Sequence, residues 1–189
     1  MKQVTPMRKN IICDWLTAIL PALLLLVLRL ALKSLPPAVE IGLTCVVLAL
    51  SVCWYRRVKK TSAPRLSFPC ILLCVVFGAA CGALSRLCFG KPANLPSGVP
   101  GFLLLCFLGP HTEEIVYRGL VYEQLLRFLP ESGAILLNSL LFGVAHGTPV
   151  QMVSACLAGL LFSLMRKKTG TIAAPILMHI ALNAAVFLL

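Results

Sequence analysis

The sequence has 189 residues, of which 59% are hydrophobic and only 12% are charged. Soluble domains usually contain about 45–50% apolar and about 25% charged residues, so this composition excludes a water-soluble globular domain and indicates a membrane protein. A bilayer-spanning helix needs about 20 residues, which leaves room for roughly seven such helices and for no separate soluble domain. We interpret the formal net charge of +11 as a sign of membrane topology, because Lys and Arg gather in the cytoplasmic loops of membrane proteins. We therefore expect no nucleic-acid partner.

Seven apolar stretches follow one another along the chain, separated by loops rich in Pro, Gly, Lys or Arg. They predict an all-α, polytopic membrane helix bundle of about seven transmembrane helices, which forms a single integral-membrane domain over residues 1–189 and has the lipid bilayer as its surroundings. The first stretch is too long for the apolar part of a signal peptide and is expected to stay as a span. The stretches are Ile12 to Leu32, Ala38 to Trp54, Leu66 to Leu84, Gly101 to Leu129, Ala134 to His146, Val150 to Met165 and Thr171 to Leu189.

Basic residues outside these stretches cluster on one side of the predicted bundle. If seven helices alternate in direction, the N-terminal tail, the loops after the second and sixth stretches, and the end of the fourth stretch all lie on the same side. The opposite loops carry only Lys33 and Lys91. This bias predicts a multi-pass protein of the cell membrane with a cytoplasmic N-terminus and an outside C-terminus. The clustered residues are Lys2, Arg8, Lys9, Arg56, Arg57, Lys59, Lys60, Arg65, Arg127, Arg166, Lys167 and Lys168.

Small residues inside the apolar stretches are interpreted as packing residues. The nine cysteines lie mostly in apolar runs, form no CxxC pair and are odd in number, which argues against a disulfide framework or a zinc knuckle. Gly78 and Gly82 are four residues apart in the third stretch, a spacing that lets two helices approach closely. Both features therefore predict helix packing.

Charged side chains inside membrane spans are costly and usually functional, so they are the most informative residues of this sequence. Several of them have a simpler explanation. Asp14, Arg29, Glu40 and Arg86 lie near the ends of their spans, where they can reach the interface. Glu123 and Arg127 have the spacing of an ion pair on a helix surface.

The charged residues that remain in the fourth stretch are Glu113, Glu114 and Arg118. Glu114 and Arg118 are four residues apart, about 40° around a helix, and are expected to form an ion pair with a structural role. Glu113 points about 100° away from Glu114. Burial there would disfavour its ionised form and raise its pKa, which suits a general base that works near neutral pH. Glu113 is therefore the leading catalytic candidate.

Three further polar residues belong to the same predicted site. His146 ends the fifth stretch, and His179 and Asn183 are four residues apart in the seventh. Counted from the cytoplasmic ends of their helices, these residues and Glu113 lie roughly 14–24 Å along the axes, so that they occupy overlapping layers of the bundle. We therefore expect three helices to direct them at one point. His111 points to a different face and is expected to lie outside the site.

These residues carry a resemblance to a known family. Glu113, Glu114 and Arg118 resemble the EExxxR motif of the CAAX protease and bacteriocin-processing (CPBP, or Abi) family of intramembrane proteases. Phe142 with His146 resembles its FxxxH motif, and His179 with Asn183 its HxxxN motif. All three motifs occur in the order of the family, over roughly residues 101–189.

The resemblance implies a catalytic core at residues 101–189, inside the C-terminal helices, and three accessory transmembrane helices in residues 1–100. It implies that Glu113 and His146 activate a water molecule, that His179 and Asn183 stabilise the oxyanion, and that Glu114 and Arg118 hold the helix geometry. The expected reaction is hydrolysis of a peptide bond in a peptide or protein substrate that enters the membrane. CAAX-type cleavage, bacteriocin maturation and self-immunity are the roles that this family suggests.

Two alternatives stay open at this stage. The protein is expected to use no cofactor, but Glu113, His146 and His179 could also supply the one carboxylate and two imidazoles of a zinc-dependent intramembrane metalloprotease. A non-catalytic immunity or scaffold protein, or a proton-coupled transporter, would also place Glu and His inside the membrane. The sequence shows no internal repeat of the kind that transporters often carry, and its polar cluster is confined to the C-terminal half.

Overall fold

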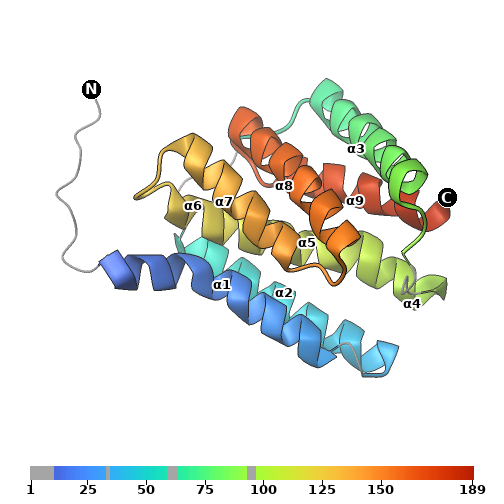
Figure 1. The fold of residues 1–189 in the computed structure, drawn as a ribbon, viewed down its shortest axis with the longest axis horizontal. Coiled ribbons are helices and arrows are strands. Elements are labelled where there is room, and N and C mark those ends of the chain that lie inside the picture. Colours follow the sequence, from blue (N-terminus) through green and yellow to red (C-terminus); the bar gives the residue numbers. More distant parts are fainter. Residues whose placement is uncertain (1–10, 33–34, 59–63, 93–96) are drawn as a thin grey trace.

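The computed structural model describes residues 11–32, 35–58, 64–92 and 97–189, and all regular structure in these ranges is helical. The elements α4 to α6 follow one another without a break, so that the described residues form seven helices, as the apolar stretches predict (Figure 1). The elements are α1 (Ile11–Leu32), α2 (Pro37–Val58), α3 (Phe68–Phe89), α4 (Gly98–Phe102), η1 (Leu103–Leu108), α5 (Gly109–Glu114), η2 (Ile115–Val121), α6 (Tyr122–Leu125), α7 (Glu131–Val144), α8 (Pro149–Thr169) and α9 (Ala173–Leu188).

Three helices continue past the C-terminal ends of the apolar stretches that predicted them, and one of them is α3, which ends at Phe89 instead of Leu84. Arg56 and Arg57 form the last turn of α2, and α8 likewise continues through Arg166, Lys167 and Lys168. Positive side chains are favourable at a helix C-terminus, because the carbonyl ends of the helix carry partial negative charge. Hydropathy alone ended these helices too early.

The ends of α8 show why this helix begins and stops where it does. Thr148 and Gln151 form a capping box, in which each side chain bonds to the backbone of the other residue. Gly170 follows the last turn with a φ of 70°, a left-handed conformation that costs glycine little. The α8 helix is thereby held at a defined position between its neighbours.

The long helix from α4 to α6 contains two π-helical turns, η1 and η2, which flank α5. The N–H of Gly109 bonds to the carbonyl of Leu104 and that of Tyr122 to Tyr117, five residues back in each case. Pro110 has no N–H and would crowd a regular α-helical turn, so a wider turn before it accommodates the ring. π-Turns of this kind occur often at functional sites, and these two enclose Glu113 and Glu114.

Successive helices run in alternating directions, and α1 begins at the opposite end of the molecule from the C-terminus (Figure 1). The α1 and α2 helices both contact η2, while α7 and α8 pack against each other and α8 packs against α9. The segment from α4 to α6 lies between α1 and α2 on one side and the C-terminal helices on the other. It is therefore covered from both sides and forms the centre of the fold.

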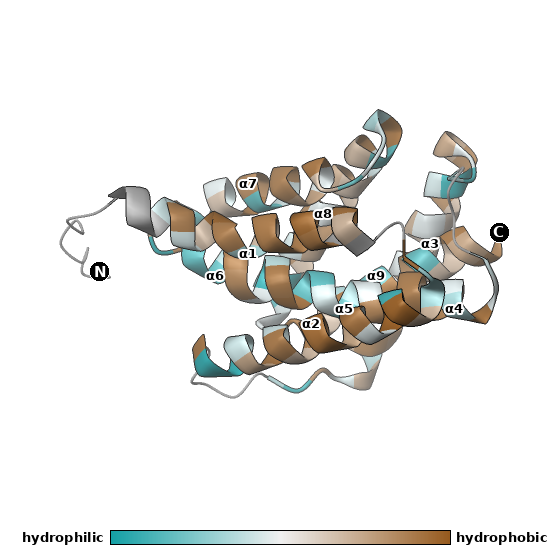
Figure 2. Cartoon of the chain, turned by 90° about the horizontal axis from the view of Figure 1, so that it is seen from below, coloured by the Kyte–Doolittle hydropathy of each residue, from teal (hydrophilic) through white to brown (hydrophobic). Residues whose placement is uncertain are grey.

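Large apolar side chains cover the outside of the bundle. Leu87 and Phe68 are 84% and 75% exposed, and Figure 2 shows hydrophobic residues along most of the length of the helices. By length and composition, three helices of the described residues, α2, α3 and α8, could each cross a membrane. Shorter apolar helices occur at Trp15–Leu28, Glu131–Val144 and Ala173–Leu188. This surface agrees with a membrane protein, while seven complete spans remain a prediction.

The predicted packing role of Gly78 and Gly82 is confirmed, because both glycines of α3 lie directly against the backbone of α9. A Cβ atom at Gly78 would lie 2.3 Å from the carbonyl oxygen of Met178, and one at Gly82 would lie 2.3 Å from that of Leu182. No larger residue fits at this distance, so the two helices are in close contact.

Other expectations about single residues are settled in part. The eight cysteines that the structure describes are free, as predicted. The predicted Glu123–Arg127 pair is wrong: Glu123 forms its ion pair with Arg166 of α8, since α6 ends at Leu125 and Arg127 lies beyond the helix.

The orientation of the helices in the membrane stays a prediction. Six of the basic residues on which this prediction rests lie outside the described residues: Lys2, Arg8, Lys9, Lys33, Lys59 and Lys60. The side chains of Cys13, Asp14 and Arg29 also lie outside the described part of the structure.

Candidate active site

An ion pair between Glu114 and Arg118 lies at the centre of the bundle. Both side chains are 0% exposed, and Arg118 Nη1 lies 3.0 Å from Glu114 Oε1. Arg118 Nη2 also donates a hydrogen bond of 2.9 Å to the backbone carbonyl of Gly159 in α8. The pair predicted from the helical spacing is confirmed, and it additionally ties the long central helix to α8.

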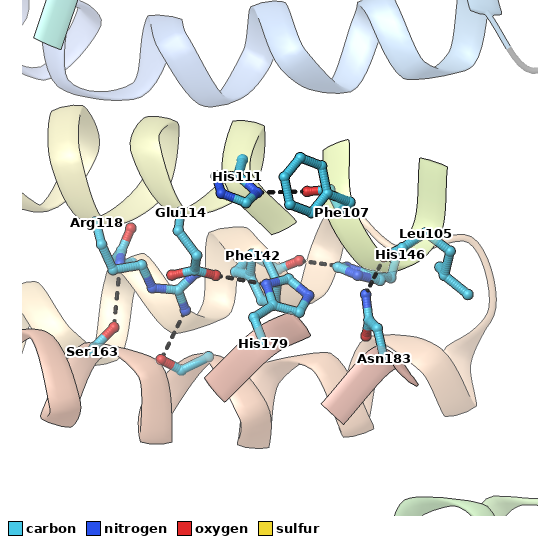
Figure 3. A network of polar contacts seen from close by, with 12 residues as sticks. Leu105, Phe107, His111, Glu114, Arg118, Phe142, His146, Ser163, His179 and Asn183 are labelled. Atoms are coloured by element: carbon cyan, nitrogen blue, oxygen red, sulfur yellow. Dashed lines mark hydrogen bonds and ion pairs between the residues drawn. The ribbon is translucent and has the colours of Figure 1, made fainter. Parts of the chain in front are cut away.

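His179 of α9 bonds to the same carboxylate. Its Nδ1 lies 2.9 Å from Glu114 Oε1, the oxygen that also accepts from Arg118 (Figure 3). A carboxylate oxygen accepts, so His179 Nδ1 carries the proton in this bond. The spacing within a single helix could not predict this contact, because the two residues are 65 positions apart. Glu114 therefore orients a candidate catalytic histidine in addition to pairing with Arg118.

The ring of Phe142 packs at the middle of this cluster. It lies 4.4 Å from the guanidinium carbon of Arg118, 4.9 Å from the ring of His146 and 5.8 Å from the ring of His179. On its other side, His179 is stacked on Phe162 with the ring centres 4.7 Å apart. These aromatic contacts hold the imidazoles in fixed orientations and shield the ion pair from water.

His146 and Asn183 each bond to a backbone carbonyl. His146 Nδ1 donates 2.8 Å to the carbonyl of Phe142, one turn earlier on α7. Asn183 Nδ2 donates 2.8 Å to the carbonyl of Leu105 in η1 (Figure 3). Leu105 lies in a π-turn, in which the wider hydrogen-bond pattern leaves a carbonyl available to α9.

A cavity of about 550 Å³ brings the predicted residues together: Glu113, His146, His179 and Asn183 all line it. Glu113 is 4% exposed and comes from α5, His146 follows the end of α7, and the other two come from α9. The site therefore joins three segments that are far apart in the sequence.

The remaining wall of the cavity is mostly apolar and comes mainly from α3, η1, α8 and α9, together with Phe142 of α7 and Pro92. Its polar members, Ser85, Gln151 and Ser154, were not predicted from the sequence. Gln151 caps α8, and neither serine belongs to a recognisable motif, so no spacing signal could identify them. His111 does not line the cavity, and its Nδ1 bonds to the carbonyl of Phe107.

The arrangement contains the groups that peptide hydrolysis requires. A buried carboxylate, Glu113, can accept a proton, and imidazole and amide groups around the same cavity can orient water or stabilise developing negative charge. In the part of the chain that the structure describes, no cluster of three or more His, Cys, Asp or Glu side chains has the arrangement of a metal site.

One family of known proteins matches the sequence. The family is described as type II CAAX prenyl endopeptidase Rce1-like, and the match covers residues 95–185. This region begins just before α4, ends within α9 and contains all seven residues of the three motifs. No curated protein and no solved structure matches the chain.

Proposed function

Because residues 95–185 of this chain belong to the CPBP/CAAX protease family, we propose that the protein is an intramembrane endopeptidase in which Glu113 and His146 activate the attacking water. The observation that carries the proposal is the common cavity of Glu113, His146, His179 and Asn183. These four residues come from three helices, yet they face one space that is large enough for a peptide segment and a water molecule.

The proposed first step is attack of water on the carbonyl carbon of the scissile bond. Glu113 takes one proton from this water and later delivers it to the departing amide nitrogen, so that the products are a free carboxyl group and a free amine. His146 assists through its second nitrogen. Because Nδ1 donates to the Phe142 carbonyl, Nε2 of the neutral ring has a lone pair that can accept a hydrogen bond from the water.

The tetrahedral intermediate places negative charge on the former carbonyl oxygen, and Asn183 and His179 are proposed to stabilise it. The Asn183 amide has two N–H bonds, one of which points to Leu105, so that the other is available to the oxyanion. His179 uses Nδ1–H on Glu114, and its Nε2 can donate only when the ring carries both protons. The role of His179 therefore requires the imidazolium form.

The proposed substrate is a peptide or protein that enters the membrane. The apolar lining of the cavity and the apolar outer surface of the bundle support this, because both favour a substrate segment that has left water. CAAX-type cleavage near a C-terminus follows from the family. Maturation of a peptide precursor, as in bacteriocin processing or self-immunity, is a second substrate type, which the assay below distinguishes.

The test is proteolysis by purified protein reconstituted in lipid vesicles, with a prenylated C-terminal peptide and an unprenylated precursor peptide as separate substrates. Glu113→Gln and His146→Gln are expected to abolish cleavage, because neither variant can complete the activation of water. The matched control is His111→Gln, which changes a histidine of the same helix as Glu113 outside the cavity and should leave turnover unchanged. Undiminished cleavage by Glu113→Gln would refute the base assignment.

A further inference from the structure

The α3 helix lies outside the matched region of residues 95–185 but contributes to the candidate active site. Cys81, Ser85 and Cys88 all line the cavity. They are spaced by four and three residues, which places them on one face of a helix. One face of this helix therefore forms part of the wall that a bound substrate would meet.

This wall is fixed in place relative to the candidate catalytic residues. Gly78 and Gly82 of α3 lie against the carbonyls of Met178 and Leu182, where a Cβ atom would approach to 2.3 Å. Those two carbonyls belong to the residues directly before His179 and Asn183. Because the backbones are in contact, the position of α9 limits how closely α3 can approach the cavity.

Both walls combine small and large side chains. The α3 helix contributes Cys81, Ser85 and Cys88 together with Leu84 and Phe89, and α8 contributes Ser154, Ala155 and Ala158 together with Leu157, Leu161 and Phe162. The three small side chains of α3 recur along one face of the helix, so they leave room there that a substrate side chain can use. An added side-chain volume on α3 would reduce that room directly.

We propose that Cys81, Ser85 and Cys88 determine specificity, by setting the size of the apolar substrate side chain that fits between α3 and α8 next to Asn183. The inference rests on the proposed peptidase function. It extends that function to a helix that carries none of the three motifs.

The first test compares two neighbouring substitutions on α3, Cys81→Phe and Ala80→Phe. Ala80 is exposed on the outside of the bundle and does not line the cavity, so it is the matched control. Both variants and the parent are assayed with peptides that differ only in one apolar residue beside the cleaved bond, which is Ala, Leu, Phe or Trp. Cys81→Phe should lower kcat/KM for the Trp peptide relative to the Ala peptide by roughly 10- to 200-fold, the range known for one methylene group too many or too few in an apolar pocket. Equal ratios in the two variants would overturn the proposal.

Ser85→Phe repeats the comparison one turn further along α3, and it decides the question if Cys81→Phe does not fold. The same loss of the largest peptides is expected from Ser85→Phe. A uniform change for all four peptides would contradict a size-selecting wall.

The second test needs no variant and no catalytic activity. The parent protein is treated with N-ethylmaleimide in the presence and absence of the Leu peptide, and modified cysteines are quantified by mass spectrometry. The peptide should protect Cys81 and Cys88 several-fold, but not Cys53, which is exposed on α2 away from the cavity. If the parent cleaves none of the peptides, the peptidase function fails, while protection of Cys81 and Cys88 still supports the wall. Absence of protection overturns the wall whether or not cleavage occurs.

Discussion

Replacing Glu114 with leucine tests how much of the stability of the bundle depends on its central charge cluster. Glu114→Leu keeps a side chain of similar size but leaves the guanidinium of Arg118 without its anion. It also removes the acceptor of His179 Nδ1, which lies 2.9 Å from the carboxylate. Two buried donors on two different helices would then lose their partner at once.

The size of the expected loss of stability follows from the complete burial of the ion pair. Both members of the Glu114–Arg118 pair are 0% exposed, so water cannot replace the lost carboxylate. Removing one partner of a buried ion pair costs about 3–5 kcal/mol, because an uncompensated charge remains inside. For a chain of this size, about 2–4 °C of melting temperature corresponds to 1 kcal/mol, so the variant should melt roughly 6–20 °C below the parent. The bond from Arg118 Nη2 to Gly159 remains and favours the lower half of this range.

The assay is thermal unfolding in detergent, followed by tryptophan fluorescence. The matched control is Glu131→Leu, since Glu131 also forms a carboxylate–cation pair, at 2.8 Å with Lys167, but both partners are 44–49% exposed. Glu131 also accepts a hydrogen bond of 3.3 Å from the hydroxyl of Tyr122, which this variant removes as well. An exposed pair contributes about 0–1 kcal/mol, so this variant should melt within a few degrees of the parent. The double variant Glu114→Leu/Arg118→Met removes the stranded charge and should recover part of the loss. Equal melting temperatures for Glu114→Leu and Glu131→Leu would refute the reasoning.

Three further predictions concern catalysis and topology. Asn183→Ala should lower kcat by roughly 100- to 1,000-fold with little change in KM, because losing one oxyanion donor acts mainly on the transition state; a large rise in KM instead would place Asn183 in substrate recognition. Protein purified in a chelator should keep its activity if Glu113 and His146 activate water without a metal, whereas loss of turnover that added zinc restores would establish the metalloprotease alternative. A reporter fused after Leu189 should be located outside the cell, as the distribution of Lys and Arg requires, and a cytoplasmic reporter would mean an even number of spans.

The sequence by itself determined the helical class, the number of helices in the described residues and the Glu114–Arg118 pair. Each of these depends only on which residues stand close to one another along the chain. Apolar runs identify helices that leave water, and a separation of four residues brings two side chains together on any helix. The family motifs likewise marked Glu113, Phe142, His146, His179 and Asn183, which line the cavity, since a motif records residue types at fixed spacing and needs no tertiary contact.

Only the tertiary structure decided which side chains meet across helices. The bond between His179 and Glu114, the pairing of Glu123 with Arg166, and the contribution of Cys81 to the cavity all depend on the rotation and separation of packed helices. Hydropathy does not indicate how a membrane helix is rotated about its own axis, because lipid and the apolar interior of the protein favour the same side chains. The π-turns around Glu113 shift the helix faces further from the regular spacing. Close contacts between glycines and backbone carbonyls, as at Gly78, then determine how α3 and α9 lie relative to each other, which the sequence did not specify.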